Sequence, residues 1–239
     1  MAEVNPKSDN KVRPFAAFRA VRRVVNDPEQ TTQVFRVIQA LSAPSLRRNF
    51  KRFRKTEVGT KVLSEQINLV DKLTDAEYLK SLPENTLGHA YYRFTSNEQI
   101  SADGLQAASE EAGYQIDDEN LDRFAKRLRS SHDLFHVLTQ YGRDPLGEAC
   151  LLAFSYGQTG NISFPFILLM ASLRLYKGAG ITVFAALWRG YRDGKRAKWL
   201  PAADWEVLLT QPLEQVRDEF VIPEPRRYQH LFAQLATAT

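Results

Sequence analysis

The stretch His132-Asp133-Leu134-Phe135-His136, followed twelve residues later by Glu148, constrains the fold more than any other part of the sequence. On an α-helix, His132 and His136 lie one turn apart and point the same way. Asp133 lies about 100° round from His132 and about 60° from His136, because a helix has about 3.6 residues per turn. The pattern therefore predicts a helix whose three polar side chains reach one point in space.

A helical hairpin is predicted directly after this stretch. Gly142 is typical of a helix end, Asp144 of an N-cap and Pro145 of a first helical position. So tight a turn would return Glu148 to the level of the two histidines. The apolar positions that precede the histidines have helical spacing and lead to the same inward face; they are Leu121, Phe124 and Leu128.

Two imidazoles and one or two carboxylates form a ligand set that suits Zn²⁺, and less selectively Fe²⁺, Co²⁺ or Mn²⁺. The spacing follows the logic of the H-E-x-x-H zinc proteases, but here the acid directly follows the first histidine, so their general base is not in place. The alternative is a pair of core histidines satisfied by hydrogen bonds, with Asp133 completing a capping box begun by Ser130. Glu148 would then be a first-turn acid facing the positive end of its helix dipole.

The spacing His132-Asp133-x-x-His136, eleven intervening residues and Glu148 resembles the signature H-D-x-x-H-x11-E of the COQ4 family of ubiquinone-biosynthesis proteins. The likeness runs from about residue 30 to 222. Other stretches similar to the family are Leu82-Pro83 through Leu87-Gly88 with Tyr91 and Phe94, Ser101-Ala102-Asp103-Gly104, Gln158-Thr159-Gly160, Trp205-Glu206, and Pro212-Leu213-Glu214-Gln215-Val216-Arg217.

The resemblance implies a protein that acts on a polyprenylated 4-hydroxybenzoate-type intermediate. The family is associated with removal of the C1 carboxylate, with or without hydroxylation of that carbon, which implies a metal-dependent decarboxylase. Its metal ligands would be His132, Asp133, His136 and Glu148, and zinc is the expected ion. Four protein ligands leave no vacancy on a tetrahedral ion, so either the ion expands its coordination or one carboxylate is not a permanent ligand. We expect Asp133 to be the group that leaves and to act as a proton shuttle.

Two other classes of function remain open. In the first, the protein is a non-catalytic scaffold that binds a polyprenyl lipid and organises the other ubiquinone-biosynthesis enzymes around a structural metal. In the second, it is a metal-dependent phosphohydrolase of the HD kind, which the adjacent histidine and aspartate favour. That second class needs further ligands on other helices, and only His89 and His230 remain as histidines.

The fold class indicated is all-α, a single-domain multi-helix bundle, because no clean run of alternating strands is present. Asp27-Pro28 and Thr74-Asp75-Ala76-Glu77 are typical helix starts. We expect a polar and basic N-terminal segment over residues 1–26, a COQ4-like helical domain over 27–225, and a loosely attached C-terminal tail over 226–239.

Charge is unevenly distributed along the chain. Residues 1–62 hold 14 Lys or Arg and 5 Asp or Glu, for +9, whereas the remainder holds 18 and 23, for −5. A basic run predicts an anionic membrane surface as a partner, with Phe50 and Phe53 in the headgroup layer. Its cations are Arg47, Arg48, Lys51, Arg52, Arg54 and Lys55. A solvated helix face is the alternative, and no nucleic acid is expected, because no nucleic-acid-binding motif accompanies the run.

Two apolar segments, 162–176 and 180–188, follow the predicted hairpin. Both are shorter than the ~20 residues that a membrane-spanning helix needs. They are interpreted as a core helix pair, as the lining of a tunnel for an isoprenoid tail beside the metal, or as both. The lipid-binding residues expected are Phe164, Phe166, Ile167, Met170, Val183 and Phe184.

Cys150 is the single cysteine, so neither an internal disulfide nor a cysteine-based zinc site can form. The N-terminus lacks the apolar segment of a secretory signal. We therefore expect a bacterial cytoplasmic protein that associates peripherally with the inner membrane, and a homodimer is one assembly that remains open.

Overall fold

The chain is helical throughout the residues that the computed structural model describes, 31–101 and 116–237. Within these ranges the only extended pairing is an isolated antiparallel bridge between Thr86 and Pro212. The predicted all-α class, a single multi-helix domain, is therefore confirmed.

The helices follow one another through short connections, except between α6 and α8, where residues 102–115 lie outside the described ranges. In chain order they are α2 (Thr31–Phe53), α3 (Glu57–Ser64), α4 (Leu69–Leu73), α5 (Ala76–Ser81), α6 (Leu87–Glu98), α8 (Glu119–Ser130), α9 (His132–Thr139), α10 (Pro145–Thr159), α11 (Ser163–Ala179), α12 (Thr182–Arg196), the 3-10 helix η1 (Leu200–Ala202), α13 (Trp205–Leu208), α14 (Leu213–Phe220) and α15 (Arg226–Ala236).

The helices begin next to residues whose side chains can cap them. Asp144 accepts hydrogen bonds from two backbone N–H groups in the first turn of α10, and Pro145 takes the first helical position, as predicted. The start predicted at Thr74 is shifted by one residue, because Asp75 is the side chain that caps α5. The start predicted at Asp27-Pro28 lies outside the described residues.

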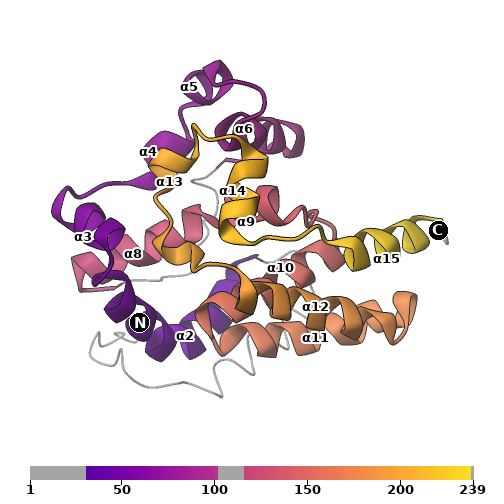
Figure 1. Cartoon of the computed structure of the whole chain (residues 1–239). Helices are drawn as coiled ribbons and strands as arrows, with labels where there is room; N and C mark the ends of the chain where they lie inside the picture. The colour runs from indigo at the N-terminus through magenta and orange to yellow at the C-terminus, as the bar shows by residue number, and fades with distance from the viewer. Residues whose placement is uncertain (1–30, 102–115, 238–239) are drawn as a thin grey trace.

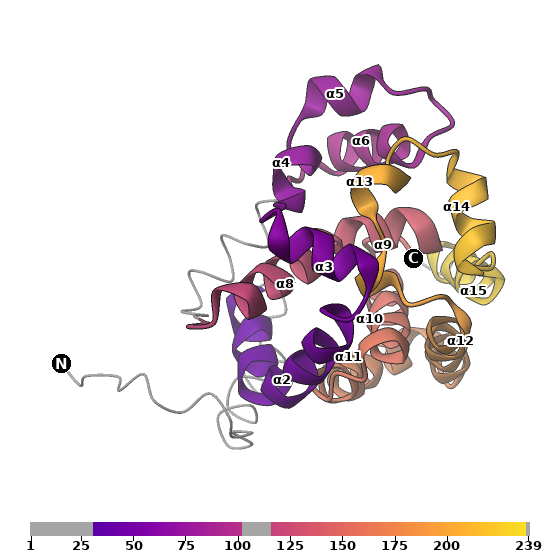
Figure 2. The same cartoon turned by 60° about the vertical axis from the view of Figure 1, so that its left-hand side comes forward.

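Three long helices form a layer in which α10 lies beside α11 and α12 (Figure 1). α9 lies on the other side of α10, and α4, α5, α6 and α13 lie farther from the layer (Figures 1 and 2). The main hydrophobic core joins α9, α10 and α12 through side chains such as Leu138, Phe154 and Val183. This arrangement places the first turn of α10 next to the histidine helix.

Close packing of α10 against α12 depends on glycines of both helices, and Gly157 and Gly194 make the closest contacts. A Cβ on Gly157 would lie 2.6 Å from the carbonyl oxygen of Tyr191 and 2.8 Å from the backbone nitrogen of Lys195. Gly194 on α12 faces the backbone carbonyl of Phe154 on α10 in the same way. Both separations are too short for a side-chain carbon, so the two backbones can meet only because neither glycine carries one.

The C-terminal segment packs onto the core, so the loosely attached tail predicted for residues 226–239 is wrong for α15. Tyr228 and Leu231 of this helix are buried in the main core. The ring of Tyr228 meets that of Tyr141 edge-on, with centroids 5.4 Å apart. The helical spacing of Tyr228, Leu231 and Leu235 was the available signal in the sequence.

A second, smaller core holds the phenylalanines of the basic run. Phe53 is fully buried, and its ring centroid lies 4.7 Å from that of Phe124 on α8. Phe50 is partly buried against the same ring at 5.9 Å. The prediction that Phe50 and Phe53 enter a lipid headgroup layer is therefore wrong, because α2 turns both rings toward α8.

The two apolar segments form the hairpin of α11 and α12, which turns at Gly180 with φ +62°. Among the described residues, no helix combines the length and the apolar character that crossing a bilayer requires. Large apolar side chains on this hairpin remain exposed, among them Leu169, Ile181 and Trp188. A core helix pair therefore accounts for only part of these segments.

Replacing Gly157 with alanine should lower the free energy of unfolding by about 1–3 kcal/mol, the usual cost of forcing extra atoms into packed contacts. The measurement is urea denaturation followed by circular dichroism. Gly178→Ala is the matched control, because a Cβ there would meet nothing closer than Leu235 Cδ2 at 3.8 Å. The control should leave stability unchanged or raise it by up to about 1 kcal/mol, since alanine favours helix. Equal losses in both variants would contradict the close-approach argument.

Candidate metal centre

The histidine helix α9 continues α8 after a single residue. Ser131 separates the two helices and keeps near-helical dihedral angles, φ −80° and ψ −1°. Ser130 lies inside α8, where its hydroxyl donates to the carbonyl of Lys126. The capping box of Ser130 and Asp133 therefore does not form, and the Asp133 side chain is buried beside His132.

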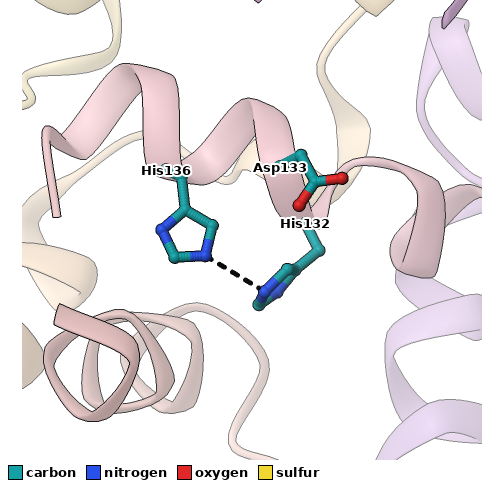
Figure 3. A group of neighbouring side chains, drawn as sticks. All are labelled: His132, Asp133 and His136. Atoms are coloured by element: carbon teal, nitrogen blue, oxygen red, sulfur yellow. Dashed lines mark hydrogen bonds between the residues drawn. The ribbon is translucent and has the colours of Figure 1, made fainter. Parts of the chain in front are cut away.

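His132 and His136 turn their imidazoles toward each other from one side of α9 (Figure 3). Their Nε2 atoms lie 3.2 Å apart, and the ring planes are nearly perpendicular, at 86°. One possible ligand atom from each of His132, Asp133 and His136 lies within 4.8 Å of the other two. A single helix thus brings three of the four predicted ligands together.

Glu148, on the first turn of α10, faces the same imidazole pair. Its Oε1 lies 3.4 Å from Nε2 of His136, and its Oε2 lies 3.7 Å from Nε2 of His132. The hairpin predicted from the sequence therefore does return Glu148 to the histidines. Burial alone would raise the pKa of Glu148, but hydrogen bonds and charge from the two imidazoles lower that pKa to about 2.

The pKa values of His132 and Asp133 are shifted upward, opposite to that of Glu148. Burial works against a charged His132, but the hydrogen bond and charge of Glu148 outweigh it, so the pKa of His132 is raised. Burial also raises the pKa of Asp133, although the imidazoles and Arg143 oppose that shift. The centre therefore holds one carboxylate that stays ionised and one with increased affinity for a proton.

His136 is fixed at its second nitrogen and across its ring face. Its Nδ1 lies 2.9 Å from the carbonyl oxygen of Tyr141. Because a carbonyl can only accept, Nδ1 carries the proton and donates it, which leaves Nε2 free to bind a ligand. Phe94 of α6 stacks on the imidazole, with centroids 5.6 Å apart and planes 23° apart.

The peptide unit that contains the Tyr141 carbonyl is held at its N–H edge by α15. The N–H of Gly142 donates to the hydroxyl of Tyr228 at 3.0 Å, and that hydroxyl donates to Asp144 at 2.5 Å. Burial and the Asp144 carboxylate raise the pKa of Tyr228, so the hydroxyl keeps its proton. Tyr228 thus connects the N-cap of α10 to the peptide group that orients His136.

Gly142 allows the Tyr228 side chain to come close to the backbone, and it does not end α9. The residue in the left-handed conformation after α9 is Gln140, with φ 59°, so the predicted end at Gly142 is wrong. A Cβ on Gly142 would lie 2.6 Å from the Tyr228 hydroxyl and 2.8 Å from Oδ2 of Asp144. Glycine is therefore required here by the hydroxyl that approaches it.

Arg217 of α14 holds the C-terminal end of the histidine helix. Its guanidinium donates to the carbonyls of Val137 and Leu138 at 2.8 and 3.0 Å. These carbonyls lie in the last turn of α9, where a cation also interacts favourably with the helix dipole. One side chain from α14 thus holds the histidine helix, and one from α15 holds the turn that follows it.

The donor set and its spacing fit a divalent metal ion. Two nitrogens bound to one tetrahedral Zn²⁺ at about 2.0–2.1 Å would lie about 3.3 Å apart. The two Nε2 atoms lie 3.2 Å apart, and Glu148 Oε1 lies 3.4 Å from His136 Nε2. His136 also has the outer hydrogen bond that metal-binding histidines normally make. The same distances suit hydrogen bonds within the cluster, so they are compatible with a metal ion without requiring one.

The predicted lipid-binding residues are divided between core and surface. Val183 is fully buried in the main core, whereas its neighbour Phe184 is exposed. The other four lie partly buried along α11. A tunnel lined by these residues stays a prediction.

Two of the six predicted membrane-facing cations also have intramolecular contacts. Arg48 donates to the carbonyls of Thr159 and Gly160 at the end of α10, at 3.0 and 3.2 Å. Arg52 lies 4.0 Å above the ring of Trp199. Contact between this basic run and a membrane stays a prediction, and Phe50 and Phe53 take no part in it.

Two residues of the centre were missed by sequence reasoning. Tyr228 lies 86 positions from Gly142, in a segment without a motif, so no local pattern could identify it. Arg143 follows the hairpin glycine, and its side chain lies near enough to oppose protonation of His132. Phe94 was named only as part of a family-like stretch, without a role.

Residues 10–226 match the sequence model of the family described as "Coenzyme Q (ubiquinone) biosynthesis protein Coq4". The chain is 28% identical over 183 residues to "Ubiquinone biosynthesis protein COQ4, mitochondrial" of Meyerozyma guilliermondii, which covers 76% of this chain and 57% of that protein. It is 31% identical over 169 residues to the coq4 protein of Aspergillus flavus, covering 70% of this chain and 57% of the relative. The chain thus spans little more than half the length of these relatives.

A crystal structure of a Nostoc punctiforme protein assigned to ubiquinone biosynthesis has the same fold. The two structures superpose with a TM-score of 0.67 over 90% of this chain and all of the other, at 20% sequence identity. At that identity the similarity establishes the fold alone.

Replacing Glu148 with glutamine should lower the pKa of His132 in protein freed of metal by a chelator. The carboxylate that raises this pKa would be gone, while the burial that opposes the charged imidazole would remain. The pKa is measured by NMR titration of the histidine ring nitrogens. Glu84→Gln, at an exposed position before α6, is the control and should leave it unchanged. An unchanged pKa in Glu148→Gln would mean that the two side chains do not interact in solution.

Replacing Tyr228 with phenylalanine should destabilise the fold by about 1–3 kcal/mol, because the N–H of Gly142 would lose its partner. The variant should also broaden or shift the Nδ1 resonance of His136, since the carbonyl that orients this ring is less restrained. Urea denaturation and nitrogen NMR measure the two effects, with exposed Tyr176→Phe as control. A destabilised variant whose His136 signal is unchanged would refute the connection from Tyr228 to the imidazole.

Proposed function

The chain belongs to the Coq4 family of coenzyme Q (ubiquinone) biosynthesis proteins, and from this premise we propose that it removes the C1 carboxylate from a polyprenylated 4-hydroxybenzoate-type intermediate in a metal-dependent reaction. The ligands proposed for a divalent ion, with zinc preferred, are His132, Asp133, His136 and Glu148. Ubiquinone synthesis, the prenylated substrate and contact with the other enzymes of the pathway are all part of the proposal. The names of the fungal relatives place those proteins in mitochondria, and the compartment of this chain stays a prediction.

The observation that carries the proposal is the convergence of four side chains from two helices. The two Nε2 atoms are 3.2 Å apart, and Asp133 and Glu148 approach the pair from α9 and α10. A bound ion would supply Lewis acidity toward the carboxylate or the ring oxygen of the substrate. This chemistry suits a reaction in which negative charge develops on an oxygen.

Asp133 is the residue proposed to move the proton. Burial raises the pKa of Asp133, so this carboxyl holds a proton more readily than an exposed aspartate, and in its protonated form it would donate to the ring carbon that carries the carboxylate. The bond from that carbon to the carboxylate then breaks, its electron pair returns to the ring, and carbon dioxide leaves. Glu148, with its pKa near 2, is unsuited to donate a proton and remains a charged partner of the imidazoles. A route that also hydroxylates the carbon would consume an oxidant and add oxygen to the product.

Arg143 is a candidate partner for the carboxylate of the substrate. Its charge acts to lower the pKa values of His132 and Asp133, and its side chain is exposed to solvent. Its guanidinium lies 3.5 Å from the carboxylate of Glu98, the last residue of α6. A substrate carboxylate could replace Glu98, because planar guanidinium groups bind carboxylates well.

A non-catalytic scaffold remains the second candidate. The observation in its favour is that His132, His136 and Glu148 lie within hydrogen-bonding or ion-pair distance of one another, so the cluster can be satisfied by its own contacts. The HD-type phosphohydrolase ranks below both. Within the described residues, His89 is hydrogen-bonded to the carbonyl of Leu82, and His230 is exposed on α15. Neither histidine therefore joins the cluster.

The test is complementation of a strain that lacks its own Coq4 protein, with prenylated intermediates measured by mass spectrometry. The wild-type chain should remove an accumulated carboxylated prenyl-phenol, and His136→Ala should leave it. His230→Ala is the matched control and should behave as wild type. A folded His136→Ala that restores normal quinone levels would favour the scaffold and exclude the metal-dependent reaction.

Asp133→Asn tests the proton role separately. The variant should retain the metal, as metal analysis can establish, while the rate of carboxylate loss falls by about 10²–10⁴, the usual contribution of a positioned acid. Full turnover with metal retained would exclude Asp133 as the proton donor. Added oxygen in the product, traced with labelled dioxygen, would identify the oxidative route.

A further inference from the structure

The α11–α12 hairpin presents an apolar surface that the described chain leaves exposed. Side chains at helical spacing on the two helices form it, and we call them the hairpin face: Leu169, Leu173, Tyr176, Ile181, Phe184 and Trp188. Ile181 at the turn is 77% exposed, and Trp188 is 60% exposed. The rings of Tyr176 and Phe184 lie 6.3 Å apart, which joins the two helices into one surface.

Exposure on this scale is unusual for an isolated globular domain. Single exposed apolar side chains are common, but a contiguous group of large ones marks a binding surface. The hairpin face runs from the middle of α11 through the turn to the middle of α12, and these two helices lie beside α15 in Figure 1. Phe232 of α15 is also exposed, and α15 packs against both hairpin helices.

The charged side chains of α11, and of α12 up to Arg192, are all positive. From Ala149 through Arg192 the sequence contains no Asp or Glu. The cations in that range are Arg174, Lys177, Arg189 and Arg192. α15 likewise contains no acid and begins with Arg226-Arg227. Arg189 is paired with Asp193, whereas Arg174, Lys177 and Arg192 are exposed.

We propose that the hairpin face docks onto the surface of an anionic lipid bilayer. Aliphatic and aromatic side chains would enter the headgroup and upper acyl region, while the flanking cations would meet lipid phosphates. Tyr and Trp are well suited to that depth, because each has an apolar body and a polar tip. This surface differs from the basic run of α2, whose phenylalanines are packed against α8.

A second copy of the chain is a poorer match for the same face. A two-fold interface would bring the patch against itself, so its cations would face cations with no acid among them. An anionic bilayer supplies the missing negative charge. Charge complementarity therefore favours an anionic bilayer over a second copy of the chain as the partner of the hairpin face.

Docking at this face would set the hairpin against the membrane at the level of the metal centre, which lies on the other side of α10. α12 runs alongside α10, with Gly190 against Cys150 and Gly194 against Phe154. The same register brings Trp188 to the level of Glu148. A prenylated substrate could then leave the bilayer near the centre; this consequence rests on the proposed function, whereas docking itself does not.

The test is co-sedimentation of the purified full chain with vesicles of phosphatidylcholine alone or mixed with phosphatidylglycerol. The wild-type chain should bind the anionic vesicles and bind phosphatidylcholine weakly. The double variant Ile181→Ser, Phe184→Ser should lose at least about tenfold in affinity, because two large apolar groups no longer leave water. Val207→Ser, exposed on α13, is the matched control and should bind as wild type.

Two further readouts separate the contributions. Trp188 fluorescence should shift to the blue on binding, and Trp188→Phe should remove that shift, because Trp205 is buried and Trp199 is partly buried. Arg174→Gln with Lys177→Gln should reduce the preference for anionic vesicles. Circular dichroism verifies that each variant is folded.

The outcomes that would overturn the proposal are distinct. No binding by the wild-type chain, or equal binding by the double variant, would exclude this face as the lipid-docking site. A wild-type dimer that the double variant converts to monomer, without vesicle binding, would assign the face to self-association. Loss of binding in Lys51→Gln with Lys55→Gln, but not in the double variant, would return the membrane contact to α2. None of these measurements requires substrate, so failure here would leave the decarboxylation proposal untouched.

Discussion

The hydrogen bond from Nδ1 of His136 to the carbonyl of Tyr141 is the interaction on which the centre depends. It leaves Nε2 of His136 facing Nε2 of His132 and the carboxylate of Glu148. The carbonyl belongs to the turn between α9 and α10, and Tyr228 holds the other edge of the same peptide group. One peptide unit therefore links the orientation of an imidazole, the start of α10 and the docking of the C-terminal helix.

The rest of the fold supplies fixed positions for this turn. Glycines allow α10 to lie backbone to backbone with α12, and Arg217 holds the last turn of α9. The surroundings shift the pKa values of the two carboxyl groups in opposite directions, because the imidazoles stabilise the charge of Glu148 while burial raises the pKa of Asp133. A metal-assisted reaction that needs one charged carboxylate and one carboxylic acid could use this difference. The exposed hairpin beside α10 would bring a membrane-borne substrate to the same end of the molecule.

The sequence predicted the centre because its geometry is local. Spacing along one helix places His132 beside His136, and a capped, proline-started turn returns Glu148 across a short connection. The sequence could not predict Tyr228, because that contact joins segments 86 positions apart. Gly142 was read as a helix end because glycine favours both positive φ and close approach, and only the packed partner distinguishes them. Phe53 was misplaced for a similar reason, since a basic run conceals which of its faces meets a neighbouring helix.

X-ray absorption spectroscopy of the zinc-loaded chain tests the central claim most directly. The account predicts one ion per chain with two imidazole nitrogens at about 2.0–2.1 Å and the remaining ligands oxygen. It also predicts that the spectrum and the stoichiometry are lost when His132 and His136 are both replaced by alanine. Failure to bind zinc stoichiometrically, or an unchanged spectrum in that double variant, would contradict a metal centre at this hairpin.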